Sequence, residues 1–298
     1  MTSNDVIFLN HLHFPVFHSG RTKTLYKIPT VEDFFHNVSK STDPIYANIE
    51  DYPYMAKLYI NFADVQFQCG GTLITPVWIL TAAHCVAPEK SSSTPKLILV
   101  CMGSSFLPSH TACENSRTVR LVSRPASTVD LAMLRLTKPF DHSKTIQPLN
   151  LKKYDLDKLE KTCKVMGWGW MQTGFTSPNL LQTDVKRMDN CFKQLICVMA
   201  TDHAPCRGDS GGPLICDGVL VGVASVGENA NCEGPSGVTI YIPVWENIKF
   251  IRQSIADSGS RKSLHIAMLG VCLLYAESVF PLVEWLLSRL WALFKLMY

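Results

Sequence analysis

Short apolar segments separated by turn residues run through the middle of the chain. Residues 57–62, 97–102 and 163–167 are of this kind, and residues 219–225 continue the pattern. Gly, Pro and Asn punctuate this region, as expected where turns connect strands. Many short strands with this punctuation are typical of an all-β sandwich or barrel, so we predict an all-β fold.

The period changes at the end of this region. Trp245, Ile248, Ile251 and Ile255 recur at the spacing of one helical face. We therefore predict a helix within residues 243–257.

The remaining residues divide into a leader and a tail. Residues 1–44 are polar and irregular, and residues 258–263 have the Ser- and Gly-rich composition of a linker. With 298 residues, of which 47% are apolar, the chain can bury one large core. We predict an N-terminal leader or pro-like segment at 1–44, a folded domain at 45–257, and a linker with an apolar helical tail at 258–298.

The tail is too apolar for a solvated extension. Residues 264–283 are long enough to span a membrane if Glu277 is tolerated there. A helix lying in the membrane surface, with Trp285 and Trp291 as anchors, is a second interpretation. A processed lipid-anchor signal is a third, and packing against another protein is the alternative to all of them. We predict membrane attachment through residues 264–298.

Composition restricts the partners and the compartment. A formal net charge of +3 at pH 7 is too small to indicate nucleic-acid binding. Eleven cysteines are too many for an ordinary cytosolic protein and indicate disulfides formed in an oxidising compartment. Zinc ligation is a poorer account, because the chain contains no Cys-x-x-Cys pair and its histidines are scattered. We predict no metal and no cofactor.

The expected location is extracellular or at the cell surface, reached through the secretory pathway. Asn37 begins a glycosylation sequon that such a route would expose to modification. Residues 1–20 make a poor signal peptide, because polar residues interrupt the apolar core and no basic segment precedes it. The cysteines outweigh this weak signal, since a cytosolic domain would not form its bridges.

The segment richest in chemistry runs from Gly208 to Gly212 and contains Ser210 between glycines. A serine hydroxyl is a poor nucleophile unless a base removes its proton and donors stabilise the resulting oxyanion. Glycine tolerates backbone angles that aim the N–H of Gly208 at the same point as the N–H of Ser210. We predict Ser210 as the nucleophile, with Gly208 and Ser210 forming an oxyanion hole.

Two upstream segments supply the other groups that such a nucleophile needs. His84 follows the apolar run at residues 78–80, and Asp130 precedes an alternating apolar segment that extends to Leu136. Each has an ordinary structural explanation, as a core histidine or a capping acid. The chain order His84, Asp130, Ser210 is nevertheless that of the chymotrypsin arrangement, and it differs from the orders in subtilisin and the α/β-hydrolases. Together the three residues predict a catalytic triad.

The chain resembles the trypsin/chymotrypsin-type serine proteases from about residue 45 to residue 257. The matching blocks are Cys69 to Ile74, Thr81 to Cys85, Asp130 to Leu134, Gly167 to Gly169 and Gly208 to Pro213. The resemblance implies two six-stranded antiparallel β-barrels with the active site between them, and a C-terminal α-helix. It also implies a serine endopeptidase with protein or peptide substrates, and protease inhibitors as further partners.

The same resemblance implies the disulfide framework. The pairs are Cys69–Cys85, Cys163–Cys216, Cys191–Cys197 and Cys206–Cys232. Cys101 and Cys113 remain and are assigned by elimination to a local bridge outside the common family pattern. Cys272, in the apolar tail, is the odd cysteine.

Substrate choice follows from the positions at which the family places its specificity pocket. Here these positions are Ala204, Ser225, Val226, Gly227 and Gly237. No acid stands where a trypsin-like enzyme has one, and burying an unpaired Lys or Arg side chain costs several kcal/mol. Glycines at both walls leave the pocket open. We therefore predict cleavage after large apolar or aromatic residues, with backbone hydrogen bonds from Ser225 and Gly227 to the substrate.

Activation is where the resemblance breaks. Family members become active when a newly cleaved N-terminus pairs with the acid before the catalytic serine, here Asp209. The usual Ile-Val-Gly-Gly terminus is not recognisable near residues 41–45, and Lys40-Ser41 is the nearest basic site. The second hypothesis is therefore a catalytically weak or inactive protease-like protein that acts by binding other proteins.

Overall fold

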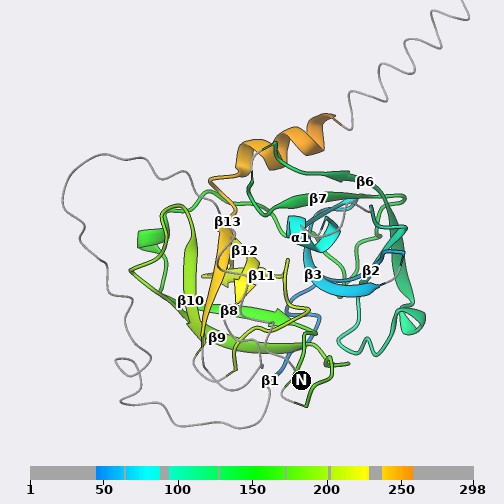
Figure 1. The fold of residues 1–298 in the computed structure, drawn as a ribbon, viewed down its shortest axis with the longest axis horizontal. Coiled ribbons are helices and arrows are strands. Elements are labelled where there is room, and N and C mark those ends of the chain that lie inside the picture. The colour runs from blue at the N-terminus through cyan, green and yellow to red at the C-terminus, as the bar shows by residue number, and fades with distance from the viewer. Residues whose placement is uncertain are drawn as a thin grey trace, which may run out of the picture. The chain divides into compact units, whose positions relative to one another are not determined.

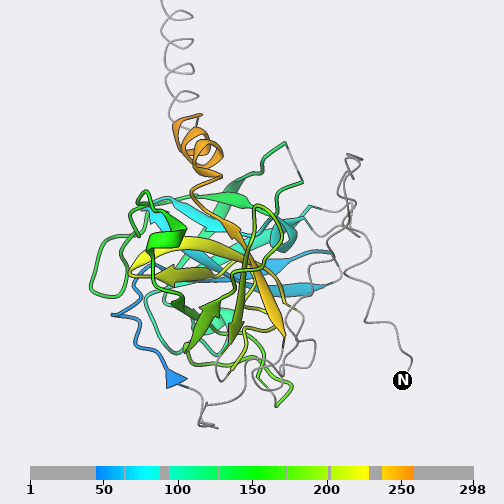
Figure 2. The same ribbon diagram turned by 90° about the vertical axis from the view of Figure 1, so that its left-hand side faces the viewer.

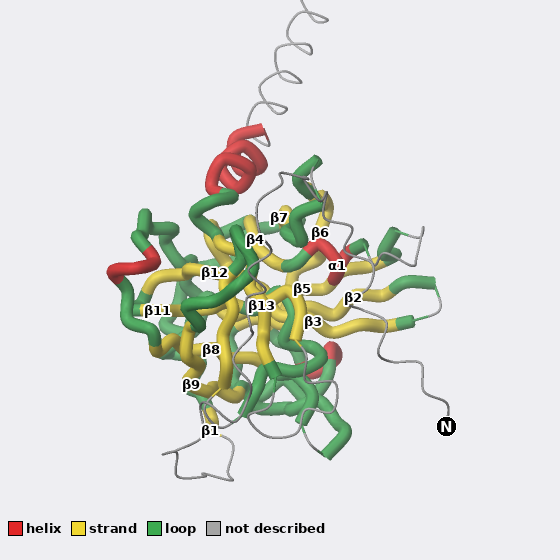
Figure 3. Tube along the Cα trace, turned by 60° about the vertical axis from the view of Figure 1, so that its left-hand side comes forward, coloured by secondary structure: helices red, strands yellow, loops and turns green. Residues whose placement is uncertain are grey.

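The computed structural model describes residues 45–63, 65–87, 94–126, 128–171, 173–200, 203–227 and 237–257. Strands are the main regular secondary structure in this part of the chain, and loops and short helical segments connect them (Figure 3). The leader at 1–44, with Asn37, and the tail at 258–298, with Cys272, lie outside the described residues.

The first barrel is a closed ring of six strands in the order β2-β3-β4-β7-β6-β5 (Figure 1). Every neighbouring pair in it is antiparallel, as expected for strands joined by short turns. Its strands are β2 (Met55–Asn61), β3 (Gln66–Thr75), β4 (Trp78–Thr81), β5 (Leu97–Met102), β6 (Asn115–Ser123) and β7 (Ala132–Leu136).

The second barrel closes in the order β8-β9-β10-β13-β12-β11, because β8 pairs with both β9 and β11 (Figure 1). A short additional strand, β1 (Ile45–Tyr46), drawn in blue in Figure 2, pairs with β9. The barrel strands are β8 (Thr162–Gly167), β9 (Leu181–Arg187), β10 (Ile196–Ala200), β11 (Pro213–Cys216), β12 (Val219–Gly227) and β13 (Val238–Pro243).

The cores explain why the apolar segments form strands. Inward-facing side chains such as Leu58, Ile79 and Leu134 are fully buried in the first barrel. Val198 and Leu214 are part of the corresponding cluster in the second. A closed barrel also leaves no unpaired sheet edge. The predicted fold, two six-stranded antiparallel β-barrels, is confirmed.

The end of the described chain is helical, as the spacing of its apolar residues predicts. The chain divides into two compact units, 1–248 and 249–298. Residues 248–257 are in a helix, and 249–257 are the described part of the second unit. Among the described residues, no helix combines the length and apolar character that crossing a membrane requires.

Four disulfides form within the described residues. They are Cys69–Cys85, Cys101–Cys113, Cys163–Cys216 and Cys191–Cys197, all pairs expected from the sequence. Cys206 is also disulfide-bonded, and Cys232, its expected partner, lies outside the described residues.

Candidate active site

Strand pairing in the first barrel brings His84 and Asp130 together. His84 lies in α1 (Ala83–Val86), one turn of helix directly after β4, and Asp130 lies just before β7. The last residue of β4, Thr81, pairs with the first residue of β7, Ala132. The end of one strand and the start of the other are therefore neighbours, although 46 positions separate the two side chains along the chain.

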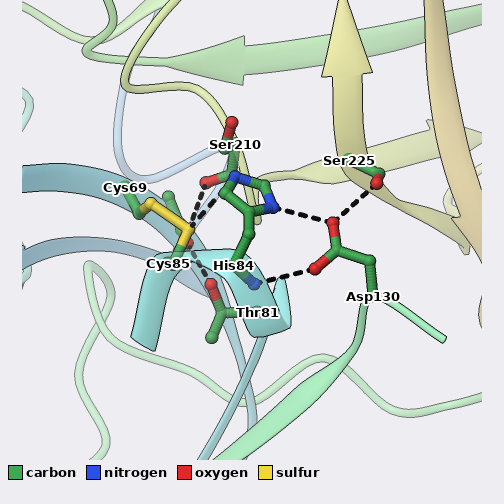
Figure 4. A network of polar contacts seen from close by, with 8 residues as sticks. Cys69, Thr81, His84, Cys85, Asp130, Ser210 and Ser225 are labelled. Carbon is green, nitrogen blue, oxygen red and sulfur yellow. Dashed lines mark hydrogen bonds and ion pairs between the residues drawn. A yellow bond between two sulfur atoms is a disulfide. The ribbon is translucent and has the colours of Figure 1, made fainter. Parts of the chain in front are cut away.

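Asp130 holds His84 through two contacts. Its Oδ2 lies 2.7 Å from the ring Nδ1, and its Oδ1 accepts a hydrogen bond of 2.8 Å from the backbone N–H of His84. Ser225, at the end of β12, donates its hydroxyl hydrogen to the same Oδ2 at 2.6 Å (Figure 4). Burial alone would raise the pKa of Asp130, but these hydrogen bonds and the His84 charge offset it and hold the pKa below its usual range. The carboxyl is therefore ionised and fixes the ring orientation.

Ser210 reaches this pair from the second barrel, in the loop before β11. Its carbonyl oxygen accepts a hydrogen bond of 2.8 Å from the N–H of Gly70 in β3. Cys85 Sγ lies 3.9 Å from His84 Nε2 and 3.7 Å from the same carbonyl oxygen, so the ring and the serine are neighbours (Figure 4). Within the described residues the Ser210 hydroxyl makes no hydrogen bond to the ring. Such contacts are often loose in enzymes without substrate.

Close approach of the two barrels makes this juxtaposition specific. β11 contacts β3, and β12 contacts β4. A Cβ on Gly70 would lie 2.9 Å from the Cα of Gly212, closer than such atoms approach in proteins. The Thr81 hydroxyl donates to the Gly70 carbonyl oxygen at 2.8 Å. The serine loop is thus anchored to the strand pair that carries His84.

The backbone at Gly208 has the conformation that its residue type allows. Its φ is +92°, in the region that favours glycine. The N–H of Asp209 donates to the Cys206 carbonyl oxygen at 3.0 Å, and the N–H of Gly212 donates to the Asp209 carbonyl oxygen at 2.9 Å. These two bonds close a tight loop around the serine.

Asp209 is partly buried, and its carboxyl lies beside Gly167 and Gly169. Its Oδ1 accepts a hydrogen bond of 2.8 Å from the N–H of Gly169, and its Oδ2 accepts one of 3.0 Å from the N–H of Cys206. Burial raises the pKa of Asp209 to about 6, against the lowering effect of these hydrogen bonds and of Lys57. A Cβ on Gly167 or Gly169 would lie 2.0 Å or 2.3 Å from the carboxyl oxygens. In the block Gly167-Trp168-Gly169 (the Gly-Trp-Gly block), the carboxyl therefore fits only because neither glycine has a side chain.

A cavity of about 280 Å³ lies beside Asp209. Leu181 and Gln182 are among its lining residues, and these are the residues of β9 with which β1 pairs. Of the positions predicted to form the specificity pocket, Ala204 lines this cavity. The lining of the cavity thus includes the acid and the β9 residues that pair with β1.

The remaining predicted pocket residues lie at the ends of two paired strands. Ser225, Val226 and Gly227 end β12, and Gly237 precedes β13. Gly227 pairs with Thr239, which is buried. The Ser225 side chain has a role that the sequence did not suggest, because it contacts Asp130 as well as lying in the expected substrate wall.

Sequence reasoning also missed Lys57. It was assigned only to a strand, yet its side chain is 2% exposed. Its ammonium group donates a hydrogen bond of 2.9 Å to the Leu107 carbonyl oxygen and lies 5.9 Å from the centroid of the Trp168 ring. Burial lowers the pKa of Lys57 to about 8, and Asp209 acts in the opposite direction. The signal available in sequence was a charged residue inside an otherwise apolar run.

One group of side chains has the geometry of a metal site but not its chemistry. Ligand atoms of Cys69, His84 and Cys85 lie within 4.8 Å of one another. The two sulfurs form a disulfide, so neither offers the thiolate that binds a metal.

Comparisons with known proteins identify the family to which the chain belongs. The model of the Trypsin family matches residues 45–251. Kallikrein 1-related peptidase b21 of Mus musculus is 32% identical over 227 residues, which cover 65% of this chain and 82% of the relative. Beta-fibrinogenase mucrofibrase-4 of Protobothrops mucrosquamatus is 30% identical over 240 residues, covering 71% and 85%. A solved structure, HL collagenase, superposes with a TM-score of 0.61 at 25% identity, over 72% of this chain and 98% of the other. This chain therefore belongs to the trypsin family of serine proteases, which are hydrolases of protein or peptide substrates.

Proposed function

We propose that the protein is a serine endopeptidase in which His84, Asp130 and Ser210 form the catalytic triad. The observation that carries the proposal is the His84 ring, held by Asp130 on its Nδ1 side, with the Ser210 loop beside its Nε2. His84 and Asp130 come from the first barrel and Ser210 from the second. The hydrogen bond from the Gly70 N–H to the Ser210 carbonyl oxygen fixes the serine loop against the first barrel.

This arrangement supports acyl transfer in two steps. Nε2 of His84 accepts the Ser210 hydroxyl proton while Oγ bonds to the substrate carbonyl carbon, and the N–H groups of Gly208 and Ser210 stabilise the oxyanion. His84 then gives the proton to the leaving amine, and the carbon–nitrogen bond breaks to leave an ester on Ser210. In the second step water gives a proton to His84 and attacks the ester carbonyl carbon. The ester bond then breaks, which releases the carboxylic acid and restores the Ser210 hydroxyl.

Labelling with a fluorophosphonate probe tests the proposal. The wild-type protein is expected to form a covalent adduct at Ser210, because only an activated serine attacks such a probe at a useful rate. Ser210→Ala should not be labelled, and Ser225→Ala, which keeps the nucleophile, should be labelled more slowly. Equal labelling of the wild type and Ser210→Ala would refute the assignment, as would failure to label folded wild-type protein of any mature length.

The second hypothesis, a protease-like binding protein, has a specific observation in its favour. Asp209 has no ion-pair partner within 4 Å among the described residues, whereas the family pairs this acid with a cleaved N-terminus. Losing one oxyanion donor costs about 10²–10³ in turnover. Folded protein that binds substrate-like peptides but resists the probe would favour this hypothesis.

We also propose cleavage after large apolar or aromatic residues. Ala204 carries no charge to pair with a Lys or Arg side chain, and glycines at 227 and 237 leave the walls without side chains. A panel of chromogenic peptides differing only before the cut bond should give kcat/KM at least 10-fold higher for Phe or Leu than for Arg, since an unpaired buried cation costs several kcal/mol. Ala204→Asp should move the preference toward Arg. Faster cleavage after Arg by the wild type would overturn the proposal.

We propose a three-part organisation and an extracellular or cell-surface location for the protein. We propose residues 45–257 as the protease domain, 1–44 as a leader or pro-like segment, and 258–298 as a membrane-associating tail. The disulfides formed in the structure support a secreted or cell-surface location, because such bridges persist in oxidising compartments.

A further inference from the structure

A buried lysine lies close to the proposed catalytic loop and is used by no step of the mechanism above. Lys57 is in the middle of β2, and its ammonium group makes one hydrogen bond to the described residues, to the Leu107 carbonyl oxygen. Two aromatic rings flank the group, with centroids 5.4 Å away for Tyr59 and 5.9 Å away for Trp168. A lysine is almost never this deeply buried without a partner.

Two structural links join Lys57 to the loop that contains Asp209. Through the first, Trp168 contacts the ammonium group, and the next residue, Gly169, donates its N–H to the Asp209 carboxyl at 2.8 Å. Through the second, Lys57 pairs in register with Gly70, whose N–H donates to the Ser210 carbonyl oxygen at 2.8 Å. The neighbouring residues Trp168 and Gly169 therefore link the surroundings of the cation to the carboxylate.

We propose that Lys57 is the resident counter-charge of Asp209, and that it positions the oxyanion loop through this carboxylate. The positioning of the oxyanion loop rests on the proposed function, whereas the charge pair between Lys57 and Asp209 does not. Lys57 is a positioning residue, since it contacts neither substrate nor reacting atoms.

The physical reason is the cost of removing two charges from water, since Lys57 is buried and Asp209 is partly buried. An isolated ammonium or carboxylate is expensive to bury, and each reduces the cost of the other even without direct contact, because water does not screen them well in the interior. The opposing effects of Lys57 and Asp209 on each other's pKa are consistent with this coupling. An ionised Asp209 accepts strongly from the N–H groups of Gly169 and Cys206. Those hydrogen bonds hold the loop in which Gly208 and Ser210 present their own N–H groups.

A double-mutant cycle in thermal stability tests the electrostatic part without requiring catalysis. Lys57→Met keeps an unbranched side chain of similar bulk and removes its charge, and Asp209→Asn removes the opposite charge. We measure the change in Tm that Lys57→Met causes in a Ser210→Ala background. This change should be more negative by about 2–4 °C or more when residue 209 is Asp than when it is Asn. Equal changes in Tm on the two backgrounds would overturn the proposal.

The cycle keeps its meaning if the single variant does not fold. Asp209→Asn should then restore folding of Lys57→Met, because it removes the unpaired carboxylate; failure to restore it would count against the proposal. Lys164→Met is the matched control, since Lys164 forms an exposed ion pair of 2.8 Å with Asp184. Its effect on Tm should be independent of residue 209. All variants are compared with the same N-terminus, because a cleaved amine would add a second cation.

Enzyme kinetics test the catalytic part. Lys57→Met should lower kcat about 10²-fold with little change in KM, because the oxyanion donors act in the transition state. The acid limb of the kcat profile should also move to higher pH, because losing the cation raises the pKa of Asp209. The other titratable groups near this acid, Tyr241 from β13 and His203 at the cavity, are unchanged in the variant. If the cycle shows coupling in Tm but Lys57→Met leaves kcat and its pH profile unchanged, the charge pair would be supported. The positioning role of Lys57 would be refuted.

Discussion

Asn in place of Asp130 is expected to lower kcat/KM about 10⁴-fold, the loss that this change causes in related Ser-His-Asp triads. The carboxylate oxygens of Asp130 face three donors: the ring N–H and backbone N–H of His84, and the Ser225 hydroxyl. An Asn side chain has only one acceptor oxygen, so its NH₂ group must face a donor or turn the ring. The favoured tautomer then carries its hydrogen on Nε2 and cannot accept the Ser210 proton. Steady-state kinetics with the preferred peptide measure the loss.

Ser225→Ala is the control for Asp130→Asn. It removes one donor to Asp130 and leaves both contacts with His84, so kcat/KM should fall only about 10-fold, in line with the loss of one charge-assisted hydrogen bond of about 1.5 kcal/mol. The pKa of Asp130 should rise, because the Ser225 hydrogen bond is one of the causes that lower it. Since Asp130 must be ionised, activity should then be lost at a higher pH as the solution is acidified. A fall for Asp130→Asn no larger than that for Ser225→Ala would contradict the assigned role of the acid.

The strands and the triad segments were predictable because their signals are local. The apolar run that ends β4 places His84 directly after a strand, and the alternating residues of β7 place Asp130 directly before one. Only the register that pairs Thr81 with Ala132 needs the folded barrel. The number of strands in each barrel and three of the four observed disulfide pairs were predicted through the family resemblance, since many pairings of the cysteines are compatible with their spacing. The fourth pair, Cys101–Cys113, was assigned by elimination once the others were paired.

The electrostatic surroundings of the site were not predictable, because they depend on packing between segments far apart in the chain. Lys57 is a charged residue in an otherwise apolar run, and only the folded barrel shows that it is buried, with its ammonium group near the Trp168 ring. The Ser225 hydroxyl was expected in the substrate wall, and its contact with Asp130 spans 95 positions of the sequence. The glycines of the Gly-Trp-Gly block matched a family pattern, but the reason for them, the carboxyl of Asp209, lies 40 positions away.

Gly169→Ala is expected to destabilise the protein strongly, because the added methyl group would overlap the Asp209 carboxyl. The new Cβ would lie 2.3 Å and 2.6 Å from the two carboxyl oxygens of Asp209 and 2.5 Å from its Cγ. The carboxyl cannot move freely, because each of its oxygens accepts a hydrogen bond from a backbone N–H, one from Gly169 and one from Cys206. Overpacking together with a displaced buried carboxylate should cost about 3 kcal/mol, which lowers Tm by about 10 °C in a domain of this size.

Gly227→Ala separates this effect from the general cost of adding a methyl group to a glycine. The nearest atoms to its new Cβ are the Thr239 hydroxyl oxygen at 3.7 Å and the Pro205 carbonyl oxygen at 3.8 Å, both ordinary contacts. Its Tm should stay within about 2 °C of the wild type, although a narrower pocket wall should reduce cleavage after the largest side chains. Differential scanning calorimetry of both variants in the Ser210→Ala background avoids self-cleavage. If Gly169→Ala and Gly227→Ala have the same Tm, the Asp209 carboxyl does not lie against Gly167 and Gly169. The proposed role of that carboxyl in holding the oxyanion loop would then be wrong as well.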